Sequence, residues 1–467
     1  MSMISQAIEV FIGSLLEIFI SEGPTTFGAR MKQVLDAVFT MLLAVIPEVL
    51  ERMDGVLAED EKRKAEWEIV RMDKRTLVTA VGDLCFRRRY YRHKGTGEMA
   101  YLLDRRLGIQ ASAKVNGDVR QRAIVLSEQV SYSKSAADST ISDISRMSVC
   151  NYIKDLGSFP VLEAEGKKRS VRNIYVEADE DHVALQEGKN AQVKLIYIHE
   201  GVVEHGDRRQ LINPRYLTWP QGRDIDTLWE TVSTYIDQQY VSEEIENVFL
   251  SGDCAPWIRA GEEWLYPCVP ILDTFHSMKA LRGLCGGNQR RASLFLHHVW
   301  ADERARATEL CQNILAQTPA ASREAKRKQA QYLLGNWQRI RNQRHPDAAG
   351  CSAEGHVSHI LSARLSSRPC GWSRENMENI AQLRVMKANG QVIQYDDLVR
   401  RKSQKEGYKS LSKADALVKT QRIEKALKKS VRSYVEETRQ NLPVLRNGKA
   451  TPIYNALKGL SLGHLAC

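Results

Sequence analysis

Two apolar runs that end in a carboxylate constrain the fold of this chain more than any other feature of its sequence. Val248-Phe-Leu-Ser-Gly-Asp253 and Asn173-Ile-Tyr-Val-Glu-Ala-Asp179 both have the composition of a buried strand, and such a strand delivers its last side chain to the edge of a sheet. Carboxylates gathered there repel one another unless a divalent cation lies between them, and hard oxygen ligands select Mg²⁺ or Mn²⁺. The sequence therefore predicts a metal site of the kind that cuts or joins nucleic acid.

The order of elements after residue 172 predicts a mixed α/β fold with a ribonuclease H-like core. Strands are expected at 173–179, 192–199 and 210–218, followed by a helix at 225–239 and by strands at 246–251 and 268–273. In the ribonuclease H order, the first acid lies on the first strand and the second follows the fourth strand. Asp179 and Asp253 occupy those two places.

Residues 280–365 interrupt that order with an all-helical insertion. Helices are predicted at 292–299, 302–316 and 321–342, and a loop containing Gly and Ser is predicted at 348–355. The core resumes after Ser366 with a helix that Ser373 caps and that carries Glu375 and Glu378. A basic helical tail follows from residue 391.

The N-terminal part of the chain is predicted to be helical and then to form a DNA-binding unit. Residues 1–70 show apolar residues at helical spacing, with packing or self-association as their expected role, and residues 71–110 form a β-hairpin around Gly82-Asp83. Residues 111–165 fit a helix-turn-helix with helices at 119–130, 133–138 and 145–156.

The third of these helices is the predicted DNA reader, capped by Ser145. Its polar residues lie clear of an apolar stripe and are expected to reach base edges in a major groove. They are Arg146, Ser148 and Asn151, and the stripe is Met147, Cys150, Ile153 and Leu156. Three-helix units that bind no DNA are also common, so both interpretations stay open.

Charge and composition favour a nucleic-acid partner. The net charge is +10, and residues 281–345 hold twelve basic and four acidic residues while residues 391–450 hold fifteen and seven. Two basic segments on a mildly acidic remainder suit a phosphate backbone, although solvated helical faces are the alternative.

Length, cysteine spacing and apolar runs predict a cytoplasmic protein of about three folding units. The nine Cys fall singly with no CxxC pair, which argues against disulfides and zinc. The longest apolar stretch, 37–49, is under 18 residues and contains Pro47, so no membrane partner is expected.

Five motifs resemble the DDE transposases of bacterial insertion sequences, in the Mutator-like group with a helical insertion, and most closely the ISLre type. They begin at Phe86-Arg-Arg-Arg-Tyr-Tyr, Tyr175-Val-Glu-Ala-Asp-Glu-Asp-His-Val, Ser251-Gly-Asp-Cys-Ala-Pro-Trp-Ile, Leu272-Asp-Thr-Phe-His-Ser-Met-Lys and Ser367-Arg-Pro-Cys-Gly-Trp-Ser. The resemblance covers most of the chain. It implies a homo-oligomer that binds the terminal inverted repeats of double-stranded DNA, nicks the ends and transfers the 3′-hydroxyls to target DNA.

The resemblance also assigns residues to the site. Asp179 matches the first catalytic acid, Asp253 the second, and Asp273-x-x-His276 an accessory element that makes His276 a catalytic residue. Glu378 fits the third acid better than Glu375, because Glu375 at the second helical position is already explained by the helix dipole. Asp179, Asp253 and Glu378 would then hold Mg²⁺ or Mn²⁺.

The segments expected from all of these patterns are 1–70, 71–110, 111–165, 166–279, 280–365, 366–390 and 391–467. Two other functions compete with the transposase. A metal-dependent glycosyltransferase would use Asp179-x-Asp181 to hold a nucleotide-sugar diphosphate, but it leaves Asp253 and the basic segments unexplained. A DNA-binding regulator would use the helix-turn-helix alone and would cleave nothing.

Overall fold

The computed structural model describes residues 3–392 except 22, 24, 111, 157–161, 207, 220–221 and 369. It is a mixed α/β protein that divides into two compact units. Unit 1 holds Met1–Phe159, His182–Val193 and the segment from Ser358, and unit 2 holds Pro160–Asp181 and Lys194–Val357. The basic tail predicted from residue 391 lies almost wholly outside the described residues.

Unit 1 begins with the predicted helices and hairpin. The helices are α1 (Met3–Ile20), α2 (Phe27–Glu59) and α3 (Glu61–Glu66), and the strands are β1 (Trp67–Thr79), β2 (Gly82–His93) and β3 (Met99–Ala100). The hairpin strands are longer than the short strands predicted, and Gly82 turns the chain between them with a φ of 118°. The second half of α2 packs on them through Leu43, Ile46 and Leu50.

The first two helices bear on the expectation of no membrane partner. Both α1 and α2 contain a stretch long and apolar enough to cross a membrane, and α1 buries none of its residues. Length and composition alone also fit a signal sequence near the N-terminus or a core helix. The cytoplasmic location therefore stays a prediction.

The predicted three-helix segment is present in unit 1. Its helices are α5 (Gly117–Ser127), α6 (Tyr132–Ser139) and α7 (Arg146–Lys154), preceded by α4 (Leu102–Arg106). The Ser145 hydroxyl caps α7 by accepting from the Ser148 backbone N at 3.0 Å, as predicted. The apolar stripe was partly wrong, because Val149 and Ile153 point inward four residues apart while Met147 is 59% exposed.

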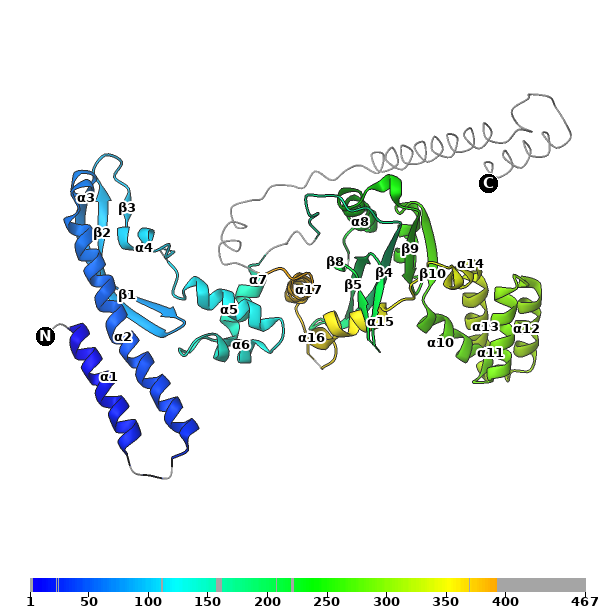
Figure 1. Cartoon of the computed structure of the whole chain (residues 1–467), viewed down its shortest axis with the longest axis horizontal. Helices are drawn as coiled ribbons and strands as arrows, with labels where there is room; N and C mark the ends of the chain where they lie inside the picture. Colours follow the sequence, from blue (N-terminus) through cyan, green and yellow to red (C-terminus); the bar gives the residue numbers. More distant parts are fainter. Residues whose placement is uncertain are drawn as a thin grey trace. The chain divides into compact units, whose positions relative to one another are not determined.

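Unit 2 contains a five-stranded sheet with β4 at its centre (Figure 1). The strand order is β10 (Cys268–Leu272), β9 (Asn247–Gly252), β4 (Asn173–Ala184), β5 (Asn190–His199) and β8 (Arg215–Trp219). β9 runs parallel to both of its neighbours, and β8 pairs antiparallel with β5. The sheet thus joins segments far apart in the sequence.

Two of the predicted strands have different limits in the structure. The run expected at 210–218 splits into β7 (Arg208–Leu211), which pairs with β6 (Val202–His205), and β8. A turn at Asn213, with a φ of 48°, separates them. β4 also continues past Asp179 to Ala184, so the first acid lies within a strand and not at its end, contrary to the prediction.

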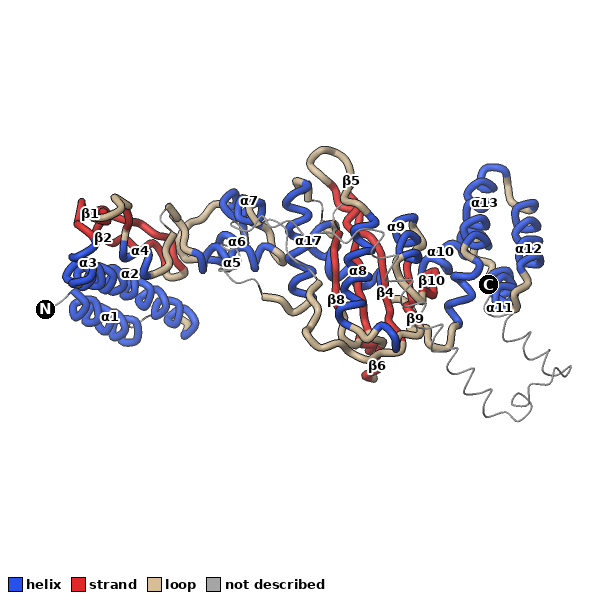
Figure 2. Tube along the Cα trace, turned by 90° about the horizontal axis from the view of Figure 1, so that it is seen from above, coloured by secondary structure: helices blue, strands red, loops and turns tan. Residues whose placement is uncertain are grey.

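The two faces of the sheet are covered differently. On one face, α8 (Ile225–Gln239) packs Leu228, Trp229 and Val232 against the apolar side of the strands (Figure 2). The short element η1 (Ser242–Glu244) follows α8, and α9 (Pro256–Arg259) and η2 (Ala260–Glu263) follow β9.

The opposite face of the sheet carries a ladder of aromatic rings. Neighbouring rings lie 5.1–5.9 Å apart along Phe249, Tyr175, His199, Tyr197 and Tyr216. The Tyr175 hydroxyl donates to the Asp347 carbonyl at 2.6 Å, and so ties the segment after the helical insertion onto this face.

The predicted helical insertion packs around a hydrophobic core in unit 2. It comprises α11 (Gln289–Trp300), α12 (Arg304–Ala316), α13 (Ala320–Gly335), α14 (Trp337–Arg341) and η3 (Asn342–Arg344). Its core is shared with α10 (Thr274–Cys285), the helix that carries His276 and that runs past the predicted start of the insertion at residue 280. The loop predicted at 348–355 is shorter than expected, because α15 (Ala353–Val357) begins inside it.

Unit 1 resumes after α15. The chain continues through the π-helix η4 (Ser358–Ser362), α16 (Ala363–Leu365) and α17 (Arg374–Ala388). Residues 366–390 therefore cluster with unit 1, whereas the sequence assigned them to the sheet-containing core.

Candidate metal and phosphoryl-transfer site

Three aspartates occupy matching positions on three neighbouring strands: Asp253 and Asp273 directly follow β9 and β10, and Asp179 lies in β4 just after the part that pairs with β9. Ala178 on β4 pairs with Gly252 on β9, and Gly252 pairs with Leu272 on β10. The residues that come next are Asp179, Asp253 and Asp273. The backbone register therefore places these three acids side by side at one end of the parallel strands.

Gly252 permits this close arrangement. A Cβ atom at this position would lie 2.5 Å from the Ala178 carbonyl oxygen and 2.9 Å from Ile258 Cδ1. The Ala178 oxygen belongs to the backbone of β4, which also carries Asp179, so it cannot move away as a flexible side chain can. A side chain at Gly252 would push apart the strand ends that present Asp179 and Asp253.

Asp273 and His276 form the pair that the sequence predicted. Asp273 caps α10 by accepting from the backbone N–H groups of Phe275 and His276, and its Oδ2 lies 2.6 Å from His276 Nδ1. That hydrogen bond raises the pKa of His276; burial opposes the effect, and the charges of Asp273, Asp179 and Asp253 add to it. The imidazole is therefore oriented through Nδ1 and favoured in its protonated form.

Asp179 lies in an acidic and largely buried environment. Its side chain is 8% exposed, and burial is the main reason that its pKa rises to about 6. The Glu180 backbone N–H and His276 oppose the rise, whereas the charges of Asp253 and Glu354 increase it. The charges of Asp253, His276 and Glu354 thus all act on Asp179 within unit 2.

The donor set fits a divalent cation. Asp179, Asp253 and Glu354 offer hard carboxylate oxygens, and their mutual repulsion is what a bound Mg²⁺ or Mn²⁺ would relieve. Asp181 is buried two residues beyond Asp179 on the same strand, where alternation places both on one face.

Glu354 is the acid that the sequence interpretation missed. It lies in the first turn of α15, inside the segment that was predicted to be a loop, so no helix was there to present it. The available signal was a carboxylate two residues after Cys351-Ser352, where a Gly-containing turn gives way to a helix. That pattern is short and has many structural explanations.

Glu378, the predicted third acid, belongs to α17 in unit 1, whereas Glu354 shares unit 2 with Asp179 and Asp253. Ser373 caps α17 as predicted, and Glu375 in the first turn lies 3.7 Å from Lys154 Nζ. The Asn379 amide donates to the Ile153 carbonyl at 2.7 Å, so α17 packs on α7. No observation tests the assignment of Glu378, and it stays a prediction.

The predicted DNA-reading residues lie on α7 with mixed exposure. Arg146 and Asn151 are exposed, in agreement with the expectation. Ser148 is half-buried, and its hydroxyl lies 3.0 Å from that of Ser145 at the helix cap. Arg146 and Asn151 are therefore better placed than Ser148 to contact a partner.

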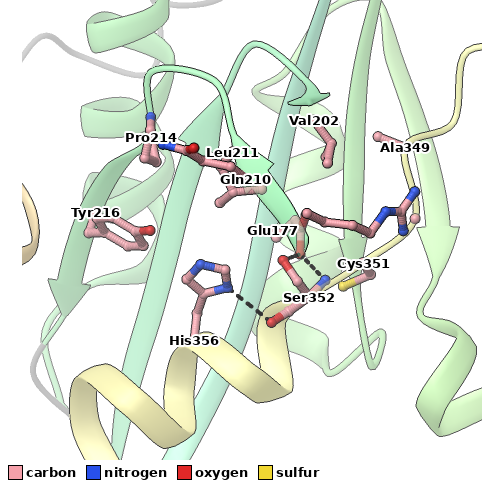
Figure 3. Close-up of a pocket in the computed structure, with 12 residues that line it drawn as sticks. Glu177, Val202, Gln210, Leu211, Pro214, Tyr216, Ala349, Cys351, Ser352 and His356 are labelled. Carbon is pink, nitrogen blue, oxygen red and sulfur yellow. Dashed lines mark hydrogen bonds between the residues drawn. The ribbon is translucent and has the colours of Figure 1, made fainter. Parts of the chain in front are cut away.

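A pocket of about 340 Å³ lies on the aromatic face of the sheet (Figure 3). Glu177, Tyr216, Ser352 and His356 line it together with residues of β6 and β7. Glu177 precedes Asp179 by two residues, and His356 follows Glu354 by two. The pocket therefore borders the acidic site along both β4 and α15.

The fold and the acidic cluster define an α/β protein with a candidate cation site, and sequence comparison gives its family. Residues 25–402 match the model of an uncharacterised protein family, UPF0236, and the chain belongs to that family. Two UPF0236 proteins of Caldanaerobacter subterraneus subsp. tengcongensis are 32% and 33% identical, each over 93% of this chain and 91% of the relative. The name of the second relative combines many locus labels from the same bacterium.

A more distant relative comes from another bacterium. It is the "UPF0236 protein in vanSb 3'region" of Streptococcus gallolyticus, which is 25% identical over 81% of this chain and 86% of the relative.

Proposed function

We propose that this protein is a DNA transposase that cleaves and joins DNA strands with Mg²⁺ or Mn²⁺ at Asp179, Asp253 and Glu354. The observation that carries the proposal is the strand register that aligns Asp179 with Asp253, together with the charge of Glu354 acting on Asp179. In this proposal, acids from two adjacent parallel strands and one helix supply the oxygen ligands. Such a site suits phosphoryl transfer.

The strand order supports a ribonuclease H-like core as the scaffold. The five strands follow the chain as β4, β5, β8, β9 and β10, and they lie in the sheet as β8, β5, β4, β9 and β10. The first strand is therefore central, with the second and third on one side and the fourth and fifth on the other. This arrangement agrees with the order predicted from the sequence, and the insertion follows β10 as in the transposases that the chain resembles.

The residues of the site have distinct roles in this proposal. When bound, the metal ions activate the attacking hydroxyl and stabilise the leaving oxygen. Asp179, Asp253 and Glu354 hold them in place. His276, oriented through Nδ1 by Asp273, holds a proton at Nε2 that it can donate to the departing 3′-oxygen.

Glu354 takes the third position in this proposal in place of Glu378. The reason is that Glu354 acts electrostatically on Asp179 within unit 2, whereas α17, which carries Glu378, packs on α7 in unit 1. The resemblance to transposases requires a third acid after the insertion, and both glutamates satisfy that requirement. The charge of Glu354 on Asp179 is what favours Glu354 in this proposal.

Further observations support DNA as the substrate. The three-helix segment presents Arg146 and Asn151 on α7, and residues 281–345 carry a surplus of eight positive charges. The many locus labels of one relative fit a gene that is present in repeated copies, which is what transposition produces.

The deciding experiment is incubation of the full-length protein with Mn²⁺ and DNA that carries the inverted repeats flanking its gene. We expect strand nicks at the repeat ends, and we expect none with the Asp253→Asn variant. Binding without nicking by the wild-type protein would favour the DNA-binding regulator and reject the transposase.

A further inference from the structure

One buried carboxylate joins the central strand to the segment that begins α15. Glu177 Oε2 accepts from the Ser352 backbone N at 2.5 Å (Figure 3). Oε2 also accepts from the Tyr197 hydroxyl, and Glu177 Oε1 lies 3.0 Å from His199 Nε2. The Glu177 side chain is 2% exposed. The Ser352 hydroxyl also donates to Oε2 at 3.3 Å, and the Cys351 thiol is a further hydrogen-bond partner of Glu177.

Glu177 and its hydrogen-bond partner Ser352 each lie two residues away in sequence from a proposed metal ligand. Glu177 precedes Asp179 by two residues on β4, so both side chains are on the same face of the strand. Ser352 precedes Glu354 by two residues and stands directly before α15. The bond from Ser352 to Glu177 therefore connects the strand of Asp179 with the helix of Glu354.

His356 holds the other side of the same helix start. Its Nδ1 lies 3.1 Å from the Ser352 carbonyl oxygen, and its ring lies 4.5 Å from the ring of Tyr197. Tyr197 also donates to Glu177, so the helix and the strand share one partner on β5. The beginning of α15 is thereby fixed to the sheet by both hydrogen bonds and ring contact.

The chemistry of this position argues for a role beyond stability. A buried carboxylate costs free energy that its hydrogen bonds only offset, and an apolar side chain of similar volume often serves packing as well. The neighbouring buried residues on β4, Val176 and Ala178, are apolar. An acid at 177 gives directional bonds to Ser352, which an apolar side chain cannot give.

We propose that Glu177 is a positioning residue: through its bond to the Ser352 backbone N–H it fixes the start of α15 and thereby sets where Glu354 stands beside Asp179. The effect of Glu177 on a metal site rests on the proposed function. The hydrogen-bonded connection itself is tested without metal or DNA.

The first test is hydrogen exchange of the peptide that spans residues 348–357 in the full-length, metal-free protein. Glu177→Gln should speed amide exchange there by about tenfold, because the Ser352 N–H loses its charged acceptor. Tyr197→Phe removes one donor to Glu177 and should give a smaller increase in exchange. This second variant provides the test if the Glu177→Gln protein does not fold.

Glu128→Gln is the matched control for the exchange measurement. Glu128 is also a buried acid, 4% exposed, but it pairs with Arg384 and Lys387 in unit 1. Its replacement should leave exchange at 348–357 unchanged. Equal exchange in the wild-type and Glu177→Gln proteins would overturn the proposal.

The second test is Mn²⁺ binding without DNA, followed through the electron paramagnetic resonance signal of free Mn²⁺. Glu177→Gln should weaken binding by about tenfold in the wild-type background and have no further effect in a Glu354→Gln background, because it acts through Glu354. Equal losses in both backgrounds would contradict the positioning role. Absence of DNA nicking by a wild-type protein that binds Mn²⁺ would instead reject the proposed function and leave this inference standing.

Discussion

The helices α15 and α17 both carry acids near their first turn, and they differ in what they pack against. α17 is capped by Ser373, bonds to the Ile153 carbonyl and places Glu375 near Lys154. α15 is joined through Ser352 to Glu177 on the central strand. Burial is the main reason that the pKa of Asp179 rises, and the charge of Glu354 on α15 adds to that rise. Both helices begin beside β4, since the Trp372 backbone N just before α17 donates to the Ala184 carbonyl at 3.2 Å. The comparison teaches that proximity to the strand of Asp179 does not by itself choose the third acid, so the proposed choice of Glu354 needs the tests below.

The largest effect is expected when either of the two acids on the sheet, Asp179 or Asp253, is replaced. Asp179→Asn and Asp253→Asn should each reduce metal-dependent cleavage by a thousandfold or more in order of magnitude, since each removes a charged metal ligand. DNA affinity should persist, because the basic surface is unchanged. Cleavage at wild-type rates by either variant would contradict the assignment of the metal site to Asp179 and Asp253. The comparison of α15 with α17 would then lose its basis.

A second substitution disturbs the strand ends and leaves every acid in place. Gly252→Ala forces a Cβ atom against the Ala178 carbonyl, so we expect a loss of about 1–3 kcal/mol in the free energy of unfolding and weaker Mn²⁺ binding. Gly335→Ala on α13 is the control, because no atom lies within 4 Å of its added Cβ. Denaturant titration of both variants measures the effect, and equal stabilities would contradict the close packing of β4 and β9.

The next prediction concerns the three-helix segment on which α17 packs. Replacing Arg146 and Asn151 with Ala should cost about 1–3 kcal/mol in discrimination between terminal-repeat and random DNA, with a smaller loss in total affinity. Competition binding with the two DNAs measures both quantities. Equal losses for both would make α7 a backbone clamp without sequence selectivity.

The smallest effect is expected at Glu375 on α17. Glu375→Gln removes a charge that the helix dipole favours and an exposed ion pair with Lys154, so stability should fall by only about 0.3–1 kcal/mol. Thermal unfolding and cleavage, measured on the same preparation, should show a slight loss of stability and normal activity. Loss of cleavage would indicate that an acid of α17 takes part in the site, contrary to the proposed assignment.

Periodicity predicted most of the elements, because strands β4, β5, β9 and β10 and the helices of the insertion have strong local patterns. The resemblance to transposases, and not periodicity, singled out Asp273-x-x-His276. Periodicity missed α15, whose five residues are too few to show an apolar period. It could not connect Glu177 with Ser352, or Glu354 with Asp179, because the members of each pair are 175 residues apart in sequence.

The most direct test of the account compares cleavage by Glu354→Gln and Glu378→Gln, the two candidates for the third acid. Nicking of terminal-repeat DNA should be measured for both over a range of Mn²⁺ concentrations, with DNA binding and thermal unfolding as controls. The account predicts that Glu354→Gln loses cleavage while it still binds DNA, and that Glu378→Gln keeps it. An active Glu354→Gln protein beside an inactive, folded Glu378→Gln protein would contradict the account and return the third acid to α17.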